Sequence, residues 1–475
     1  MCIRDRGNLI YIVPLDPAYK AGLAVHLPVN EISMAFFIKE RRRSMEKTRR
    51  EFVKLVGGAA LGAGYLLAAG GKASAQMTPA RGVPSEPVRI GVMPGLTGVI
   101  GVPGTAAWRA TQIWADEVNA AGGILGRKVE LFMEEETTAK ECVERFKKLT
   151  LEKKVDMITG LMSTGNGLAV GPLAEELGQL WLSWDGTTQK GVEETMPKTK
   201  FAFRSIDNEA EAIGGGILTA RFFPKIKTIA GINNDYSYGR DCWDAFQAVL
   251  KHFNPNVKAV EALWPKLGET DFTSHIAALK KAKPDLIMTS FWSGDVPIFM
   301  KQAAAVGLFK NIKGCFTTGG GVHYTLKKEF TPEGLILGYN SMYFKWTDTW
   351  PLLTKFVKTY YEKYKEYPVY ECDHAYSCLQ AYKAAVEKCY AILGKWPTKE
   401  EIGKSLSGIL VPSLSGYRGY REDNIQICNF FMGITTHKNP FDFVTIDPVE
   451  ILTPSQIIKP TTGTKLYEWI KGWKA

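Results

Sequence analysis

A regular alternation of short apolar runs and amphipathic stretches, which starts at residue 88, constrains the fold of this chain more than any other feature. The first run, VRIGVM (88–93), leads into a Pro/Gly/Thr loop, and the next stretch (104–123) has apolar residues spaced three and four apart with a glycine stop. The pattern recurs as far as residue 321. Strands alternating with helices of about 10–15 residues indicate parallel sheets covered on both faces. Because the pattern forms two series that meet near Ser205, we predict an α/β fold of two Rossmann-like, doubly wound lobes.

The net charge argues against a nucleic-acid partner. The whole chain carries a formal charge of +10, but residues 1–75 alone hold twelve Lys/Arg against six Asp/Glu. The remaining charge of about +4 is spread over some 400 residues without long basic blocks. The basic character therefore belongs mostly to the N-terminal segment.

That segment has the pattern of an export signal. Two arginines, Arg49 and Arg50, precede a Gly/Ala/Leu-rich run (55–71), which is followed by the small residues Ala73-Ser74-Ala75. The run is too short and glycine-rich for a membrane span, which needs about 20 strongly apolar residues. It resembles a twin-arginine signal peptide, so we expect cleavage before Gln76 and a periplasmic or extracytoplasmic mature protein. No cysteine follows the run, so we expect no lipid anchor, and Met45 is a more natural start than Met1.

The cysteines predict neither a disulfide framework nor a metal site. Seven cysteines lie in the expected mature chain, and their odd number and scattered spacing match neither kind of site. The stretch CDHAYSC (372–378), with Glu371, holds potential metal ligands. Because it continues into residues with the spacing of an amphipathic helix, we favour a helix over a metal site. We predict no metal and no cofactor.

Small polar residues, aromatic residues and glycines follow the expected strands at the point where each strand ends. In open parallel sheets, ligands bind beyond the carboxyl ends of the strands, so these loops are candidates for a binding site. The alternative is that each loop is a helix cap or a turn, where Ser, Thr and Gly are common. Agreement among six loops favours a site, whose candidate residues are Thr97, Ser163, Thr164, Asp185, Gly186, Thr187, Tyr238, Trp292 and Gly320.

Several segments resemble the extracytoplasmic solute-binding proteins of ABC importers, of the leucine/isoleucine/valine-binding type. The resemblance runs from about Val88 to about Arg421 and is carried by EVNAAGGILGRKVEL, SWDGTTQK and INNDYSYGRDCWDAF. It implies two lobes joined by three crossovers that close over one small molecule and perform no chemistry. With it we divide the chain into an upstream segment (1–44), a signal peptide (45–75), lobe 1 (86–205 and 339–421), and lobe 2 with a C-terminal extension (206–338 and 422–475).

The resemblance also implies roles for the candidate residues. Ser163, Thr164 and Thr187 match the donors that hold a ligand carboxylate at helix N-termini, where free N–H groups favour an anion. Asp185 and Gly186 match backbone positions at the ligand, Tyr238 an aromatic residue that closes over it, and Trp292 a wall. The family's acidic partner for a ligand ammonium falls in TTGGGVHY (317–324), where this chain has Gly319, Gly320 and Gly321. Either Asp185 supplies that charge, or the ligand carries no ammonium.

An enzymatic function lacks a supporting motif. The sequence contains no G-x-S-x-G elbow, no G-x-G-x-x-G opening a helix after the first strand and no Walker loop. We therefore expect a monomeric, non-enzymatic binding protein that captures an amino acid or a related carboxylate or amide, with an ABC permease and ATPase as partners. The alternative is a ligand-sensing receptor or regulator of the same fold.

Overall fold

The computed structural model describes residues 3–5, 8–10, 77–185, 187–461 and 463–472. The predicted signal peptide, with Arg49 and Arg50, lies outside the described residues, and so does Gly186. The chain separates into two compact units, Met1–Ser74 and Ala75–Ala475. In the first unit, β1 (Ile3–Asp5) and β2 (Asn8–Ile10) pair as an antiparallel hairpin. The second unit contains both predicted lobes.

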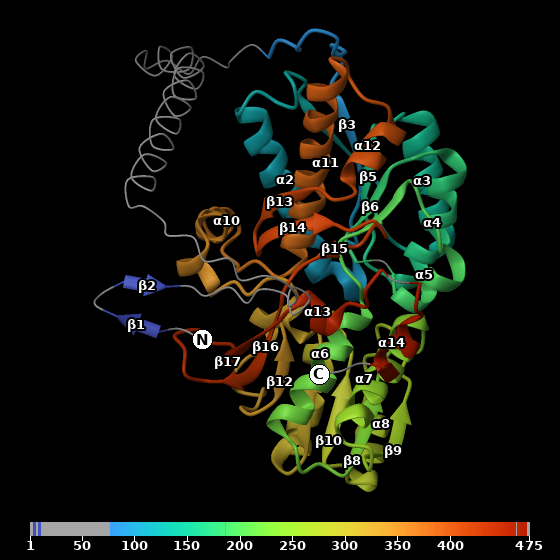
Figure 1. Cartoon of the computed structure of the whole chain (residues 1–475). Coiled ribbons are helices and arrows are strands. Elements are labelled where there is room, and N and C mark those ends of the chain that lie inside the picture. The colour runs from blue at the N-terminus through green and yellow to red at the C-terminus, as the bar shows by residue number, and fades with distance from the viewer. Residues whose placement is uncertain (1–2, 6–7, 11–76, 186, 462, 473–475) are drawn as a thin grey trace, which may run out of the picture. The chain divides into compact units, whose positions relative to one another are not determined.

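Lobe 1 is built on a parallel five-stranded sheet with the order β4-β3-β5-β6-β7. Its strands are β3 (Val88–Met93), β4 (Val129–Met133), β5 (Met157–Gly160), β6 (Trp181–Ser183) and β7 (Ala202–Arg204). The helices between them are η2 (Gly98–Ile100), α2 (Gly101–Ala120), α3 (Ala139–Lys147), η3 (Lys148–Glu152), α4 (Thr164–Leu177) and α5 (Gln189–Thr195). This lobe forms the upper part of the second unit in Figure 1.

Lobe 2 is built on a seven-stranded sheet with the order β17-β16-β12-β11-β10-β8-β9. Strands β8 to β12 are parallel, whereas β16 and β17 add antiparallel to the edge formed by β12. The strands are β8 (Thr228–Ile232), β9 (Lys258–Leu263), β10 (Leu286–Thr289), β11 (Lys313–Phe316), β12 (Ile336–Gly338), β16 (Phe430–Thr436) and β17 (Thr445–Leu452). The helices are α6 (Glu209–Phe222), α7 (Ser237–Phe253), α8 (Thr273–Ala282), α9 (Asp295–Ala305), η4 (Leu308–Lys310), η5 (Gly319–Thr325), α13 (Pro454–Ile457) and α14 (Leu466–Gly472).

The chain passes between the lobes in the segments 205–208, 339–345 and 428–429. After the second passage come η6 (Trp346–Thr349), α10 (Pro351–Tyr364), α11 (Glu371–Leu393) and α12 (Lys399–Leu406), and α11 packs against α2 of lobe 1. A small antiparallel sheet of β13 (Leu410–Ser413), β14 (Gly416–Tyr420) and β15 (Gln426–Ile427) leads into the third passage. Figure 1 shows α11 and α12 beside the strands of lobe 1, from which they are distant in sequence.

These elements confirm the predicted fold class of two doubly wound α/β lobes. The helix expected from residue 104 begins earlier, at Gly101. Residues 422–475 do add strands to lobe 2, although β15 instead pairs with β14 in the small sheet. The glycines of α6 permit close packing, because a Cβ on Gly215 would lie 2.8 Å from Thr317 Cγ2 and 3.0 Å from Cys315 Sγ.

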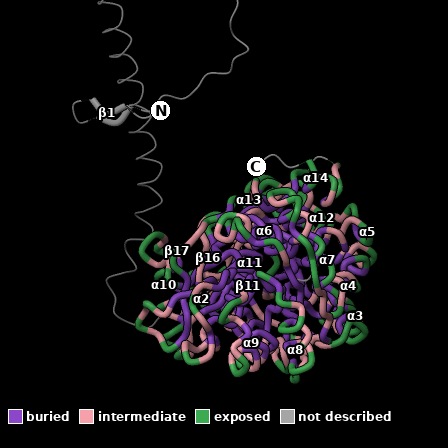
Figure 2. Tube along the Cα trace, turned by 90° about the horizontal axis from the view of Figure 1, so that it is seen from below, coloured by how far each residue is buried: buried purple, intermediate pink, exposed green. Residues whose placement is uncertain are grey.

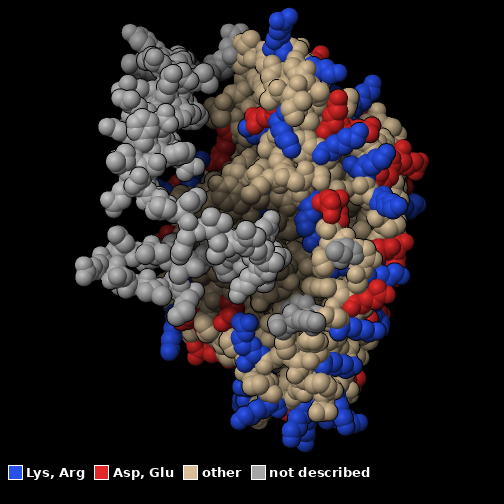
Figure 3. All heavy atoms as spheres, viewed as in Figure 1, with Lys and Arg blue, Asp and Glu red and all other residues tan. Residues whose placement is uncertain are grey.

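Burial and charge follow the layered architecture. The strands β5 and β10 are buried along their whole length, as expected of central parallel strands, and Figure 2 shows the buried trace inside a shell of exposed segments. Seven cysteines are free and buried among the described residues. Lys and Arg gather at the lower end of lobe 2 in Figure 3. Exposed lysines occur at the amino ends of its strands: Lys227 before β8, Lys258 in β9 and Lys313 in β11. Within the described ranges, no helix is both long and apolar enough to cross a bilayer.

Candidate functional site

The candidate site lies at the switch point of each sheet, where the chain stops adding strands on one side of a central strand and begins to add them on the other. In lobe 1, β3 has β4 on one side and β5 on the other, and in lobe 2, β8 stands in the same way between β9 and β10. Helices that leave neighbouring strands at such a point run to opposite faces of the sheet, which opens a crevice beyond the strand ends. The loops after β5, β6, β8 and β10 therefore point toward one region between the lobes.

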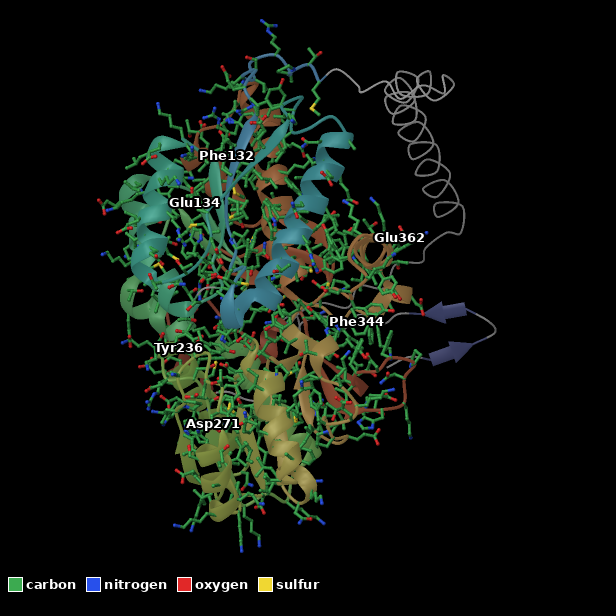
Figure 4. All side chains as sticks on the ribbon, turned by 180° about the vertical axis from the view of Figure 1, so that it is seen from behind. Phe132, Glu134, Tyr236, Asp271, Phe344 and Glu362 are labelled. Atoms are coloured by element: carbon green, nitrogen blue, oxygen red, sulfur yellow. The ribbon has the colours of Figure 1, made fainter. Side chains whose placement is uncertain are left out.

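A small cavity of about 10 Å³ occupies that region. This volume is at the lower limit for a single ordered water, so the lobes are closed on each other. Tyr236, labelled in Figure 4, lies where the two lobes meet. The cavity is lined by residues of both lobes and of α11: Met162, Asp185, Asn208, Glu211, Tyr236, Tyr238, Trp292 and Tyr370.

Asp185 contributes a carboxylate from the loop after β6. It is 8% exposed, and its Oδ1 lies 2.6 Å from Nδ1 of the buried His374 on α11. The other ring nitrogen of His374, Nε2, is 3.3 Å from Oδ1 of Asn340. Both ring nitrogens of His374 thus lie close to an oxygen atom of a neighbouring side chain.

Glu211 contributes a second carboxylate, from the first turn of α6. Its Oε2 accepts a hydrogen bond of 2.9 Å from the hydroxyl of Tyr238, and its Oε1 accepts one from the side-chain amide of Asn340. Burial raises the pKa of Glu211 well above its usual value, and the negative charge of Asp185 adds to this effect. A continuous polar chain therefore runs from Asp185 through His374, Asn340 and Glu211 to Tyr238.

Glu371, the first residue of α11, adds a third carboxylate beside the cavity residue Tyr370. It is fully buried, and neither of its oxygens has a hydrogen-bond partner among the described residues. Burial raises its pKa well above the usual value, and Asp185 contributes to the shift. A Cβ on Gly321 would lie 2.9 Å from Glu371 Oε1. The glycine loop of lobe 2 therefore leaves room for an acid supplied by another element.

Glu136 closes the N-terminus of α4, where the sequence predicted a carboxylate of the ligand. Its carboxylate accepts hydrogen bonds from the backbone N–H groups of Met162 (2.8 Å) and Ser163 (2.9 Å) and from the side chain of Asn166 (2.9 Å). Glu136 is 1% exposed, and burial raises its pKa to about 7 although these donors oppose the shift. An acid of the protein itself thus lies beside the start of α4 and accepts the N–H group of its N-cap residue, Ser163.

Aromatic rings form much of the remaining wall. The indole N–H of Trp292 donates a 3.1 Å hydrogen bond to the hydroxyl of Tyr236, and the ring of Tyr236 lies 5.9 Å from that of Tyr238. From the opposite side, the ring of Tyr370 lies 5.3 Å from that of His374. Tyr238 and Trp292 both line the cavity, and their predicted roles, Tyr238 closing over a ligand and Trp292 as a wall, stay predictions.

The other predicted residues take different places. Thr164 and Thr187 are buried; the hydroxyl of Thr164 accepts a 3.4 Å hydrogen bond from Asn208, and that of Thr187 has no partner among the described residues. Thr97 is exposed, and its hydroxyl bonds Glu135 at 2.5 Å. Gly320 is buried against Gly338 and Tyr339, and neither it nor Thr97 is among the residues that line the cavity.

Sequence reasoning missed several members of this site, and for some of them a signal was available. Glu136 follows the strand β4, so the rule that selected the other strand-end loops covers it as well. Glu371 and His374 were noticed only as possible metal ligands. Among the described residues, no cluster of three or more His, Cys, Asp or Glu side chains is arranged to hold a metal ion.

Two parallel-sheet lobes with the same strand order, hinged by crossing segments and closed on an interlobe cavity, define a two-lobed solute-binding fold. The structure is similar to a solute-binding protein of an ABC transporter from Rhodopseudomonas palustris BisB5 in complex with 3,4-dihydroxybenzoic acid (TM-score 0.66, 20% identity, 76% of this chain and 96% of that chain). It is also similar to the branched-chain amino acid transporter substrate binding protein LivJ from Streptococcus pneumoniae in complex with isoleucine (TM-score 0.64, 18% identity, 78% and 100%).

The sequence gives the same answer at the level of family. The Leu/Ile/Val-binding protein homolog 8 of Brucella melitensis biotype 1 is 26% identical over 353 residues, which cover 70% of this chain and 83% of that protein. The model of the periplasmic binding protein family matches residues 87–432, so the chain belongs to that family. The resemblance that the sequence motifs indicated is therefore confirmed.

Proposed function

We propose that the mature chain is the extracytoplasmic solute-binding component of an ABC importer. In this role it captures a small molecule between its lobes and presents it to a membrane permease and ATPase, without chemical change. One observation carries the proposal: the switch points of both sheets supply buried polar and aromatic groups to a single interlobe cavity. Membership of the periplasmic binding protein family supports it.

Opening and closing of the lobes are part of the proposed function. A cavity of about 10 Å³ has no room for a solute, so binding requires that the lobes separate first. A buried ion pair lies where the crossing segments meet: Nη1 of Arg418 is 2.7 Å from Oδ2 of Asp373. The same guanidinium donates to the backbone oxygen of Ser205 in the first passage and, at 3.3 Å, to the hydroxyl of Ser341 in the second. These contacts hold the crossing segments together, which favours rotation of the lobes as rigid bodies about those segments.

The location and assembly of the protein belong to the same proposal. The pair Arg49-Arg50, the apolar run and the Ala73-Ser74-Ala75 motif support export by the twin-arginine route and cleavage before Gln76. The mature protein then works as a monomer outside the cytoplasmic membrane. Free, buried cysteines suit a chain that folds before export, in a reducing compartment.

A solution experiment tests the proposal directly. The purified protein is screened by thermal shift against amino acids, aromatic acids, amides and amines, because a ligand that binds only the folded state must raise the melting temperature. Small-angle scattering then compares the protein with and without each ligand found. We expect the ligand to favour the closed state and to reduce the radius of gyration. Equal dimensions in both states, with a confirmed ligand at saturation, contradict the proposed capture mechanism.

A further inference from the structure

We propose that the interlobe cavity selects a small organic cation with N–H donors, such as an alkylammonium or a guanidinium, and excludes a ligand with a free carboxylate. This inference rests on the proposed function and names the class of its solute. It is carried by three features of the site: an excess of acceptor oxygens, an acid of the protein beside the position predicted for a ligand carboxylate, and a wall of aromatic rings.

Acceptor oxygens dominate the polar surface of the cavity. Asp185, Asn208 and Glu211 line it, whereas none of the lining residues is a Lys or Arg. Oδ1 of Asn208 has no partner among the described residues, although the side chain is only 5% exposed. A buried acceptor without a donor costs stability, so each of these oxygens favours a ligand that supplies N–H groups.

The negative charge is only partly balanced within the protein. Among the described residues, the only basic side chain within ion-pair distance of Asp185 is the imidazole of His374. Glu211 accepts hydrogen bonds from the neutral Tyr238 and Asn340, and Glu371 has no hydrogen-bond partner among the described residues. Buried carboxylates are expected to be paired or coordinated, so this imbalance indicates a cation in the bound state.

An acid of the protein already lies beside the position predicted for a carboxylate of the ligand. Glu136 takes the N–H groups of Met162 and Ser163, just before the first turn of α4, and the side-chain amide of Asn166. An incoming carboxylate would have to compete with Glu136 for these donors, and it would also face the carboxylate of Asp185 with no Lys or Arg lining the cavity. Like charges in a poorly hydrated site repel strongly, so acids and amino acids bind less well than amines.

The aromatic wall suits the same class of ligand. The rings of Tyr236, Tyr238, Trp292 and Tyr370 all line the cavity. A cation over the face of a Trp or Tyr ring is attracted by the ring quadrupole, and the attraction grows when water is excluded. The lobes close almost completely over this space, which provides that exclusion.

Matched probes with one carbon skeleton test the proposal. The first set is isopentylamine, leucine and 4-methylpentanoate, and the second is agmatine, arginine and 5-guanidinopentanoate; binding of each is measured by calorimetry to the purified protein. We expect at least one of the two amine members to bind and the acid of the same set to bind at least tenfold more weakly. Binding of an acid or amino acid at least as tight as its amine overturns the proposal, and so does the absence of binding by both amine members.

Variants locate the cation on the proposed groups. Glu211→Gln and Asp185→Asn should each weaken the amine about tenfold to a hundredfold, the loss expected for one charge-assisted hydrogen bond. Glu175→Gln is the matched control, because Glu175 accepts hydrogen bonds from the backbone N–H groups of Lys200, Phe201 and Ala202 near the far end of α4. Equal affinities of Glu211→Gln, Asp185→Asn and the control for the amine contradict the proposal.

Proton release separates a cation from a neutral amide. The titratable groups around Glu211 are Asp185 from the β6 loop, Asp207 before α6, Tyr238 on α7, and Tyr370 and Glu371 on α11. A bound cation lowers the raised pKa of Glu211, so binding releases protons and the affinity rises from pH 5 to pH 8, where an amine stays protonated. Calorimetry in two buffers of different ionisation enthalpy measures this release. Tighter binding by 4-methylpentanamide than by isopentylamine, or amine binding with no proton release, overturns the inference. If the acids bind and compact the molecule, the proposed function stands and only this inference fails.

Discussion

The two lobes have the same order of parallel strands, yet they bring different chemistry to the cavity. Lobe 1 offers Asp185 and a helix start beside Glu136, whereas lobe 2 offers the rings of Tyr236, Tyr238 and Trp292 together with the carboxyl group of Glu211. The shared strand order thus determines where a ligand can bind, because the switch points of both sheets face the interlobe cavity. The residues that follow each strand decide what is bound there.

The contrast extends to the helices that begin at the cavity. The start of α4 is closed by Glu136, which comes from the loop after β4, a different strand of the sheet. In lobe 2, α7 starts after Tyr236, whose side chain makes no capping hydrogen bond. In lobe 1, Glu136 therefore stabilises the start of α4, whereas in lobe 2 the aromatic residue Tyr236 lies at the start of α7. The predictions below test these different roles of the two lobes.

The largest effect is expected for Glu136→Ala in lobe 1. The substitution leaves the N–H groups of Met162 and Ser163 and the amide of Asn166 without their acceptor, and each unsatisfied buried donor costs about 1–3 kcal/mol. We expect the free energy of unfolding at pH 6, measured in urea, to fall by about 3 kcal/mol or more. Acetate should raise the melting temperature of this variant but not that of the wild type, with chloride at equal ionic strength as the control.

The pH dependence of the same variant is opposite to that of an ordinary surface acid. Because the pKa of Glu136 is raised to about 7 in the folded protein, its stabilising contribution is complete below its unfolded pKa and is lost as the pH rises through 7. The cost of Glu136→Ala should therefore shrink between pH 6 and pH 8. A constant cost over this range, together with no rescue by acetate, would show that Glu136 does not fill an anion position.

A smaller effect is expected for Tyr238→Phe in lobe 2. The hydroxyl of Tyr238 donates to the buried Glu211, and a hydrogen bond to a charged group contributes about 1.5–3 kcal/mol. The loss should be larger at pH 8 than at pH 5, since the pKa of Glu211 is raised and its ionised form is the better acceptor. Tyr339→Phe is the matched control, because that buried hydroxyl has no partner among the described residues. Equal unfolding free energies for the two variants would contradict the bond.

The smallest effect concerns a contact between the lobes. The hydroxyl of Thr188 accepts from the N–H of Gly191 as the cap of α5 and donates, at 2.9 Å, to Asp241 on α7. Thr138 caps α3 in the same way but makes no contact with lobe 2 among its described hydrogen bonds. Thr188→Val should lower the free energy of unfolding by about 1 kcal/mol more than Thr138→Val. If a denaturant titration shows the same loss of unfolding free energy for Thr188→Val and Thr138→Val, Thr188 acts only as the cap of α5.

The sequence predicted the lobes and the loops of the site better than the site itself. Periodicity identifies strands and helices because burial repeats along the chain, and strand ends then identify the loops around Asp185, Tyr238 and Trp292. The convergence of Glu211, Asn340 and Glu371 has no local signal, because these residues come from α6, a crossing segment and α11. Which acid of the stretch 134–136 turns inward depends on the path of the chain after β4. The family resemblance suggested a ligand carboxylate at Ser163, where the structure has Glu136.

The buried cysteines have a consequence for the chemical durability of the protein. Burial raises the pKa of Cys142 and Cys428 to about 11 and that of Cys315 and Cys378 to about 12. At neutral pH almost none of these thiols is in the thiolate form, the species that reacts with peroxides and disulfides. On the proposed route of export, slow oxidation of these thiols lets the folded chain persist outside the cytoplasm without a disulfide among its described residues.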